Sequence, residues 1–354
     1  MSDRWSLHDA EWRNPAHVVA LWQGGEPAGL RSRVRGRFWE ALDGLCLLVT
    51  REYEHVVVGL SEGRQTHMTL PHPSGLAVGA ERVTVASTRN PNQLVELAPA
   101  AVEGRPLVPV RTEFHPGALY LHDLAYVGGV LHGNAVGQNA VVRLDGGRAE
   151  RVWWPKAIET PGGPDFSKNY LQLNSIAAGL SLETSFFSAS TERLSSRRPG
   201  HRNFPVDGRG VVFSGATREP VVRGLTRPHS ARLHEGRLWV ESSGYGELGV
   251  VEDSRYEAVA RLPGWTRGLA FHRDLAFVGV SRVLPRFHMY APGLDLDRSV
   301  CGVQAVDTGS GEVVGSLVWP EGNQVFAVEV VPLSLTSGFP RGDLRDLYFK
   351  LPLA

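Results

Sequence analysis

The sequence predicts an all-β fold, a six-bladed β-propeller with a central channel. Six short segments repeat one pattern along the 354 residues, a variable residue followed by a small or apolar stretch. A strand-rich repeat with a period of about 40–50 residues is typical of propeller blades. Most of the segments are followed by a turn and a second apolar strand. The chain shows no long helical periodicity, which excludes an α/β dinucleotide-binding fold.

The variable residues set the period of the repeat. The segments are 73–78, 121–126, 173–178, 228–233, 266–271 and 325–330, and their variable residues are Ser74, His122, Asn174, His229, Arg267 and Phe326. The steps between these residues, which we call the signature residues, are 48, 52, 55, 38 and 59 positions. We expect each segment to form the inner strand of a blade, with its signature residue at the mouth of the channel.

The other elements follow from apolar runs between turn residues. Residues 1–43 are predicted to be an irregular N-terminal extension, since Asn-Pro and Gly-Gly pairs interrupt them. The apolar runs 45–50 and 55–60 precede the first repeat and have the length of strands. They are expected to complete the last blade and close the ring, which removes exposed strand edges. The propeller is therefore predicted over 44–335, with 336–354 as a C-terminal tail packed on it.

Blades 4 and 5 show the strand pattern most clearly. Their expected strands are 228–233, 237–241, 247–251 and 256–262, then 268–271, 275–280, 302–306 and 312–318. Two segments break the rhythm and are expected to be long loops at one rim, 154–169 and 192–210, and blade 5 carries an insertion at 284–299. Loops of this length in a compact domain are usually functional or mobile.

Composition excludes several classes of protein. The chain has 37 basic and 37 acidic side chains, a formal net charge of +0, which argues against nucleic acid as a partner. No apolar run reaches about 18 residues, so no membrane span is expected. The polar N-terminus lacks a signal-peptide region, and a cytoplasmic location is expected. Cys46 and Cys301 are too few for a disulfide framework or a cysteine zinc site and are expected to be free and buried.

Four signature residues carry the candidate chemistry. If the ring closes, His122, Asn174, His229 and Arg267 converge near the axis. Two imidazoles suit a general base and a general acid, because their ordinary pKa near ~6.5 lets small shifts set opposite protonation states. Arg267 fits a carboxylate or phosphate through two parallel hydrogen bonds. The pattern indicates an enzyme for a small carboxylate-bearing molecule, with Asn174 orienting the reacting oxygen.

Further substrate contacts are expected from Ser74, Glu241 and Tyr245. Alternatively, His122, His229 and Asn174 hold one divalent metal ion. A metal-free site is favoured slightly, since Arg267 repels a cation, and strand alternation is expected to turn Asp123 away from the channel.

Other interpretations give these residues no role in catalysis. Arg267 would pair with a buried acid such as Asp123 or Glu329, the histidines would bond to strand carbonyls, and Asn174 would satisfy backbone groups. A propeller that binds a metabolite, sugar or peptide without transforming it is the other functional class. The sequence leaves the oligomeric state open.

Six phrases in order resemble a bacterial family of conserved hypothetical proteins, a domain of unknown function. They are Leu-His-Asp-Leu-Ala (121–125), Leu-Asn-Ser-Ile-Ala (173–177), Pro-His-Ser-Ala-Arg-Leu-His-Glu-Gly-Arg-Leu-Trp-Val (228–240), Gly-Tyr-Gly-Glu-Leu-Gly (244–249), Pro-Gly-Trp-Thr-Arg-Gly-Leu-Ala-Phe (263–271) and Cys-Gly-Val-Gln-Ala-Val-Asp (301–307). The resemblance covers roughly residues 70–332 and brings no established reaction with it.

By fold the family is similar to six-bladed propellers that include gluconolactonases and strictosidine synthases. That likeness implies a lactonase-like hydrolase, a lyase or an isomerase. The chain departs from the family pattern at Ala327, where Asp is usual, at Gln172, where His is common, and at Glu241, where Asp or Asn is usual. These departures imply a divergent substrate.

Overall fold

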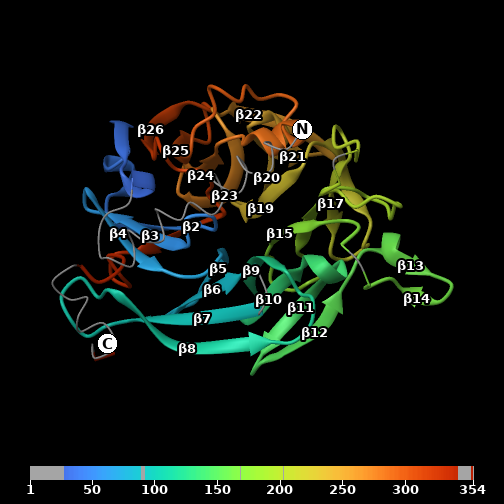
Figure 1. The fold of residues 1–354 in the computed structure, drawn as a ribbon, viewed down its shortest axis with the longest axis horizontal. Helices are drawn as coiled ribbons and strands as arrows, with labels where there is room; N and C mark the ends of the chain where they lie inside the picture. Colours follow the sequence, from blue (N-terminus) through green and yellow to red (C-terminus); the bar gives the residue numbers. More distant parts are fainter. Residues whose placement is uncertain (1–27, 89–91, 168, 202, 342–351, 354) are drawn as a thin grey trace, which may run out of the picture.

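The fold is a ring of six antiparallel sheets, each forming one blade (Figure 1). The structure, a computed structural model, describes residues 28–88, 92–167, 169–201, 203–341 and 352–353. The inner strands are β5 (Pro73–Val78), β9 (Leu121–Val127), β15 (Leu173–Ala177), β19 (Pro228–His234), β23 (Trp265–His272) and β27 (Ala327–Pro332). Each coincides with one predicted segment, although β27 begins just after Phe326. The all-β, six-bladed prediction is confirmed.

The blades are built in chain order from the axis outward. Five blades follow the inner strand with three more strands: β6 (Val83–Ser87), β7 (Asn92–Pro99) and β8 (Leu107–His115); β10 (Val130–Ala135), β11 (Ala140–Asp145) and β12 (Arg148–Trp153); β16 (Phe186–Ala189), β17 (Gly210–Ser214) and β18 (Pro220–Leu225); β20 (Arg237–Ser242), β21 (Glu247–Glu252) and β22 (Arg255–Arg261); β24 (Leu275–Ser281), β25 (Gly302–Asp307) and β26 (Val313–Val318). Strands β13 (Glu159–Thr160) and β14 (Gly163–Pro164) form a small separate hairpin.

The sixth blade closes the ring with both ends of the chain. Its order is β27, β2 (Leu45–Arg51), β3 (Val56–Ser61) and β4 (Arg64–Thr69), with Thr50 opposite Ala327. All residues of β2 and β3 are buried, as their continuous apolar runs require. The prediction that the runs 45–50 and 55–60 complete the last blade is confirmed.

The N-terminal extension is more regular than expected. Strand β1 (Arg33–Gly36) pairs with the outer strand β26, and the buried side chains of Leu30 and Phe38 join the core. Every residue of β1 is exposed, so its pairing depends on backbone hydrogen bonds to an open sheet edge and left no apolar pattern in the sequence. Residues 1–27 lie outside the described residues. In the C-terminal tail, Thr336 and Phe339 are buried, and 342–351 also lie outside.

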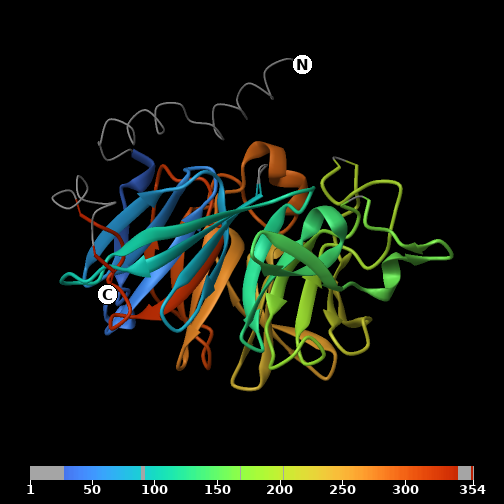
Figure 2. The same ribbon diagram turned by 90° about the horizontal axis from the view of Figure 1, so that it is seen from below.

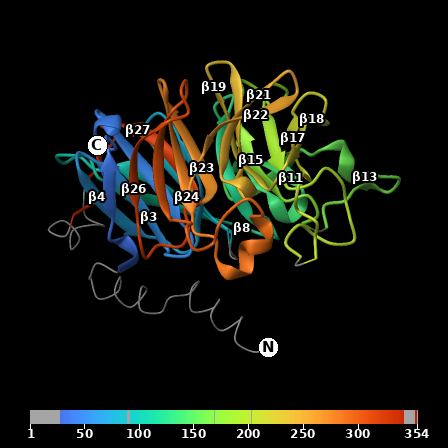
Figure 3. The same ribbon diagram turned by 90° about the horizontal axis from the view of Figure 1, so that it is seen from above.

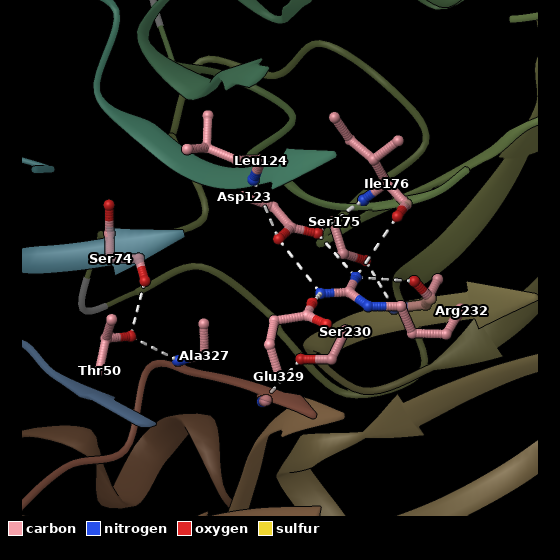
Figure 4. A network of polar contacts seen from close by, with 12 residues as sticks. Thr50, Ser74, Asp123, Leu124, Ser175, Ile176, Ser230, Arg232, Ala327 and Glu329 are labelled. Carbon is pink, nitrogen blue, oxygen red and sulfur yellow. Dashed lines mark hydrogen bonds and ion pairs between the residues drawn. The ribbon is translucent and has the colours of Figure 1, made fainter. Parts of the chain in front are cut away.

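The inner strands share an irregularity beside the signature residue. In β5, β9, β15, β19 and β23 the register to the second strand shifts at this point, as in a β-bulge. Side chains from one blade bond to backbone N–H groups of the next (Figure 4). Ile176 N donates to Asp123 Oδ2 (2.9 Å), Ala231 N to Ser175 Oγ (2.7 Å) and Gly268 N to Ser230 Oγ (2.7 Å). These bonds lock neighbouring blades around the axis.

The predicted rim loop 192–210 and the predicted insertion 284–299 meet on one face of the ring (Figures 2 and 3). The loop 192–210 packs Phe204 and Val206 against Tyr290 of the short helix η6 (Pro285–Tyr290). Tyr290 also donates its hydroxyl to Gly200 O (2.7 Å). No helix of the described residues is long and apolar enough to cross a membrane.

Candidate functional site

A cavity of about 580 Å³ lies where the signature residues converge. His122, His229, Arg267 and Phe326 line it, and so do residues of the rim loop 192–210 and the insertion 284–299, among them Arg198 and Tyr290. A void of about 10 Å³ adjoins the cavity and shares these four signature residues with it, and Asn174 lines the void. The ring therefore brings five of the six signature residues to one place, and four of them to the cavity.

Five further lining residues come from a second position of the same repeat. They stand two residues before a signature residue: Tyr120, Gln172, Arg227, Trp265 and Gln324. The backbone at Tyr120, Gln172 and Arg227 is left-handed, with φ of 56°, 53° and 54°. This turn directs the chain into the inner strand at the cavity wall. Sequence reasoning missed these residues, although the repeat read two positions upstream would have indicated them.

Two buried guanidinium groups face the cavity without a carboxylate partner. Arg227 is 4% exposed and Arg267 is 6% exposed. Arg227 donates to Gln172 Oε1 (2.7 Å) and to Pro199 O (3.3 Å), and its Cζ lies 4.6 Å from the centroid of the Tyr290 ring. The Cζ of Arg267 lies 3.3 Å from the centroid of the Phe326 ring. Neither guanidinium forms an ion pair with another described residue.

Burial also changes the pKa of the two guanidinium groups. It lowers the pKa of Arg227 to about 10, and it lowers the pKa of Arg267, opposed by the charge of Glu52. With its amide oriented to satisfy both neighbours, Gln324 accepts from Arg267 Nη1 (2.7 Å) and donates to Glu52 Oε2 (3.3 Å). Glu52 therefore contacts Arg267 through the amide, and both guanidiniums retain positive charge at the cavity wall.

Other buried arginines of the molecule do have acids. Arg51 Nη2 lies 2.9 Å from Glu54 Oε1. Arg232 lies 2.8 Å from Asp123 (Nη1 to Oδ2) and 3.3 Å from Glu329 (Nη2 to Oε1), in the centre of the ring (Figure 4). The expected alternative, that Arg267 pairs with Asp123 or Glu329, does not hold, because Arg232 takes both acids.

Asp123 faces the channel, so the expectation that alternation turns it away is wrong. It lines the small void together with His122, the residue before it. The bulge in β9 breaks the two-residue alternation at this point, and both side chains reach the axis. Two carboxyls in this region have a raised pKa: burial raises that of Glu241 to about 8 and that of Glu329 to about 7.

His229 is held as a neutral imidazole. Burial, followed by the charges of Arg267 and Arg227, lowers its pKa well below 6.5. Its Nε2 is buried and has no hydrogen-bond partner among the described residues. The His122 ring packs against Tyr120 (centroids 4.8 Å apart) and Phe326 (5.4 Å). The ring therefore stays unprotonated and keeps a nitrogen lone pair free, which a general base requires, although the lowered pKa makes it a weaker base than an ordinary imidazole.

The remaining predicted site residues lie outside the cavity. Ser74 donates to Ala86 O (3.0 Å) and lies 2.9 Å from Leu121 O, so it ties strands together. Glu241 is fully buried, and Tyr245 donates to Asp207 Oδ1 (3.1 Å) near the rim. Asn174 Nδ2 donates to Pro228 O (2.9 Å) and to Ser190 Oγ (3.1 Å), which leaves its Oδ1 without a partner among the described residues.

The metal site predicted at His122, His229 and Asn174 stays a prediction, and the charges around the void favour an anion. Within the described part of the chain, no group of three His, Cys, Asp or Glu side chains is placed to hold one. His122, His229 and Asn174 do line one void, but Arg267 lines it too. The guanidinium charge repels a cation and attracts an anion.

The chain matches one known protein family over most of its length. Residues 37–337 match the family described as "Domain of unknown function (DUF4915)". The chain belongs to this family. The match spans the whole propeller and confirms the resemblance seen in the sequence. A comparison with curated proteins gave no match.

Solved structures share the fold at low identity. A protein of unknown function from Bacteroides caccae is 9% identical, with a TM-score of 0.54 over 81% of this chain and 99% of that one. A chain of the nidogen/laminin complex is 8% identical, with a TM-score of 0.56 over 81% and 98%. A gluconolactonase from Xanthomonas campestris is 15% identical, with a TM-score of 0.42 over 71% and 77%. At these identities the likeness extends to the fold alone.

Proposed function

We propose that the protein binds a small carboxylate-bearing molecule in the cavity and transforms it by histidine acid–base chemistry. The observation that carries the proposal is the pair of buried guanidiniums of Arg227 and Arg267, which form no ion pair with a described residue. Burying a charge without a partner costs several kcal/mol. An anionic ligand would offset that cost here, as Asp123 and Glu329 do for Arg232.

The neighbours of the two arginines suggest how the ligand is used. A carboxylate at Arg267 lies close to His229, since both line the cavity and the adjoining void. His229, neutral and buried, would act as the base. His122 would act as its partner for proton return. The chemistry belongs to one of three classes in which histidines can move the protons: a lactonase-like hydrolase, with water as the second reactant, a lyase or an isomerase.

A binding experiment tests the first half of the proposal. Thermal unfolding in a panel of small mono-, di- and hydroxycarboxylates identifies ligands, and calorimetry measures their dissociation constants. Arg267→Met should weaken binding about 10–100-fold, because a charged hydrogen bond is worth about 1.5–3 kcal/mol. Arg143→Met is the matched control, since Arg143 pairs with Glu150 on the surface and should leave binding unchanged. Equal binding by Arg267→Met and the wild type would refute the proposal.

A second variant separates an enzyme from a binding protein. His229→Phe preserves most of the ring volume and removes both nitrogens. An enzyme should lose turnover of a bound carboxylate by about 10²–10⁴-fold and keep its affinity. If His229→Phe turns over its ligand at the wild-type rate, the histidine has no role in the chemistry.

A further inference from the structure

The small void beneath the cavity suggests which of the three reaction classes applies. Its volume is about 10 Å³, close to the roughly 10–15 Å³ that one water molecule needs. His122, Asn174, His229 and Arg267 line it, and all but Asn174 also line the cavity. A molecule in the void therefore lies against the ligand site.

Two polar atoms of the lining residues need a partner of water size. Asn174 Oδ1 and His229 Nε2 are both buried, and neither has a hydrogen-bond partner among the described residues. The Asn174 side chain is fixed, because its Nδ2 donates to Pro228 O (2.9 Å), next to His229. A buried polar group without a partner costs about 1–3 kcal/mol, and buried waters typically satisfy such groups.

We propose that this void holds a single water molecule that serves as the nucleophile, and that the protein is a hydrolase of small carboxylate-bearing esters or lactones. The inference rests on the proposed function. Both free atoms accept hydrogen bonds, provided that the neutral His229 carries its proton on Nδ1. The water then donates one hydrogen to Asn174 Oδ1 and the other to His229 Nε2. Its lone pairs remain available for attack.

The step balances without any further reactant. The water oxygen bonds to the acyl carbon while one of its protons passes to His229 Nε2. The bond between the acyl carbon and the leaving oxygen then breaks, and the proton passes from His229 by way of His122 to that oxygen. For an ester the products are a carboxylic acid and an alcohol, and for a lactone both groups remain on one hydroxy acid.

Crystal structures of the wild type and two variants test the position of the water. The wild type should show one water molecule within hydrogen-bond distance of Asn174 Oδ1 and His229 Nε2. Asn174→Leu, of similar volume, should lose it. Ser190→Ala removes a different partner of Asn174, its contact at 3.1 Å, and should keep it. A void with no water, or with a metal ion, overturns the proposal.

Kinetics test the role of the water. The wild type should hydrolyse members of a panel of carboxylate-bearing lactones and 4-nitrophenyl esters. Asn174→Leu should lower kcat about 10²–10³-fold with little change in KM, and Ser190→Ala should not. If the protein binds carboxylates through Arg267 and hydrolyses no member of the panel, the hydrolytic step is wrong and anion binding stands. If it binds no carboxylate, the proposed function itself fails.

Discussion

Two buried arginines should respond in opposite ways when replaced by methionine. Arg232→Met leaves Asp123 and Glu329 buried without their cation. Removing one partner of a buried ion pair costs about 3–5 kcal/mol, so the free energy of unfolding should fall by that amount. Arg267→Met instead removes a buried charge that forms no ion pair among the described residues and feels the Glu52 carboxylate only across the Gln324 amide. Methionine fills most of the same space beside the Phe326 ring.

The size of the second effect follows from two opposing contributions. Arg267→Met leaves the Gln324 carbonyl without its 2.7 Å hydrogen bond, a loss of about 1–3 kcal/mol. It also removes the desolvation penalty of a buried cation, which is several kcal/mol. The free energy of unfolding should therefore be unchanged or higher in the absence of ligand.

Urea unfolding followed by tryptophan fluorescence measures both variants against the wild type. The difference between them is informative even if the absolute values shift. If Arg267→Met is destabilised as strongly as Arg232→Met, Arg267 serves the fold, and the reasoning that assigns it to an anionic ligand is refuted.

Three further predictions concern stability and reactivity. The pKa of Glu241 is raised from 4.5 to about 8 by burial, so the folded state keeps a proton that the unfolded state releases. The free energy of unfolding should then fall by up to about 1.4 kcal/mol per pH unit between these values, and Glu241→Gln should flatten that slope in urea titrations. Gly268→Ala should lower the free energy of unfolding more than Gly63→Ala does in the same assay. Both glycines have positive φ (92° and 73°), so an alanine is strained at either position. The new Cβ would also lie 2.8 Å from Val328 Cγ2 at Gly268, whereas at Gly63 it would meet nothing within 4 Å. Equal losses would show that space at Gly268 is not limiting. Burial raises the pKa of Cys46 and Cys301 to about 12, so a thiol reagent should label neither in the native protein and both in denaturant, whereas labelling of the native protein would contradict their burial.

The architecture could be predicted from the sequence because each blade repeats the same pattern of strands and turns. Apolar inner strands, turns and a regular period specify six sheets, and the runs at 45–60 specify how the ring closes. Strand β1 could not be found in this way, since all its residues are exposed and its pairing uses only the backbone.

The candidate site was predictable in its centre and not at its edges. His122, His229 and Arg267 meet because they occupy one position of the repeat. Asp123 was misplaced because a bulge cancels strand alternation, and a bulge has no clear sequence signal when its residues are ordinary.

Residues at the edges of the site depend on loop geometry. Arg227 was missed although it stands in the repeat, because its role depends on a left-handed turn two residues before His229. Tyr290 comes from the insertion 284–299, whose path no local pattern specifies.

Anomalous diffraction from crystals soaked in bromide would show whether the cavity binds an anion at its two arginines. Bromide is a small anion that reports where positive potential is both accessible and uncompensated. We expect a bromide peak inside the cavity, in contact with the guanidiniums of Arg227 and Arg267, and no such peak in Arg267→Met crystals. Bromide found only at surface arginines, with none in the cavity, would contradict this expectation.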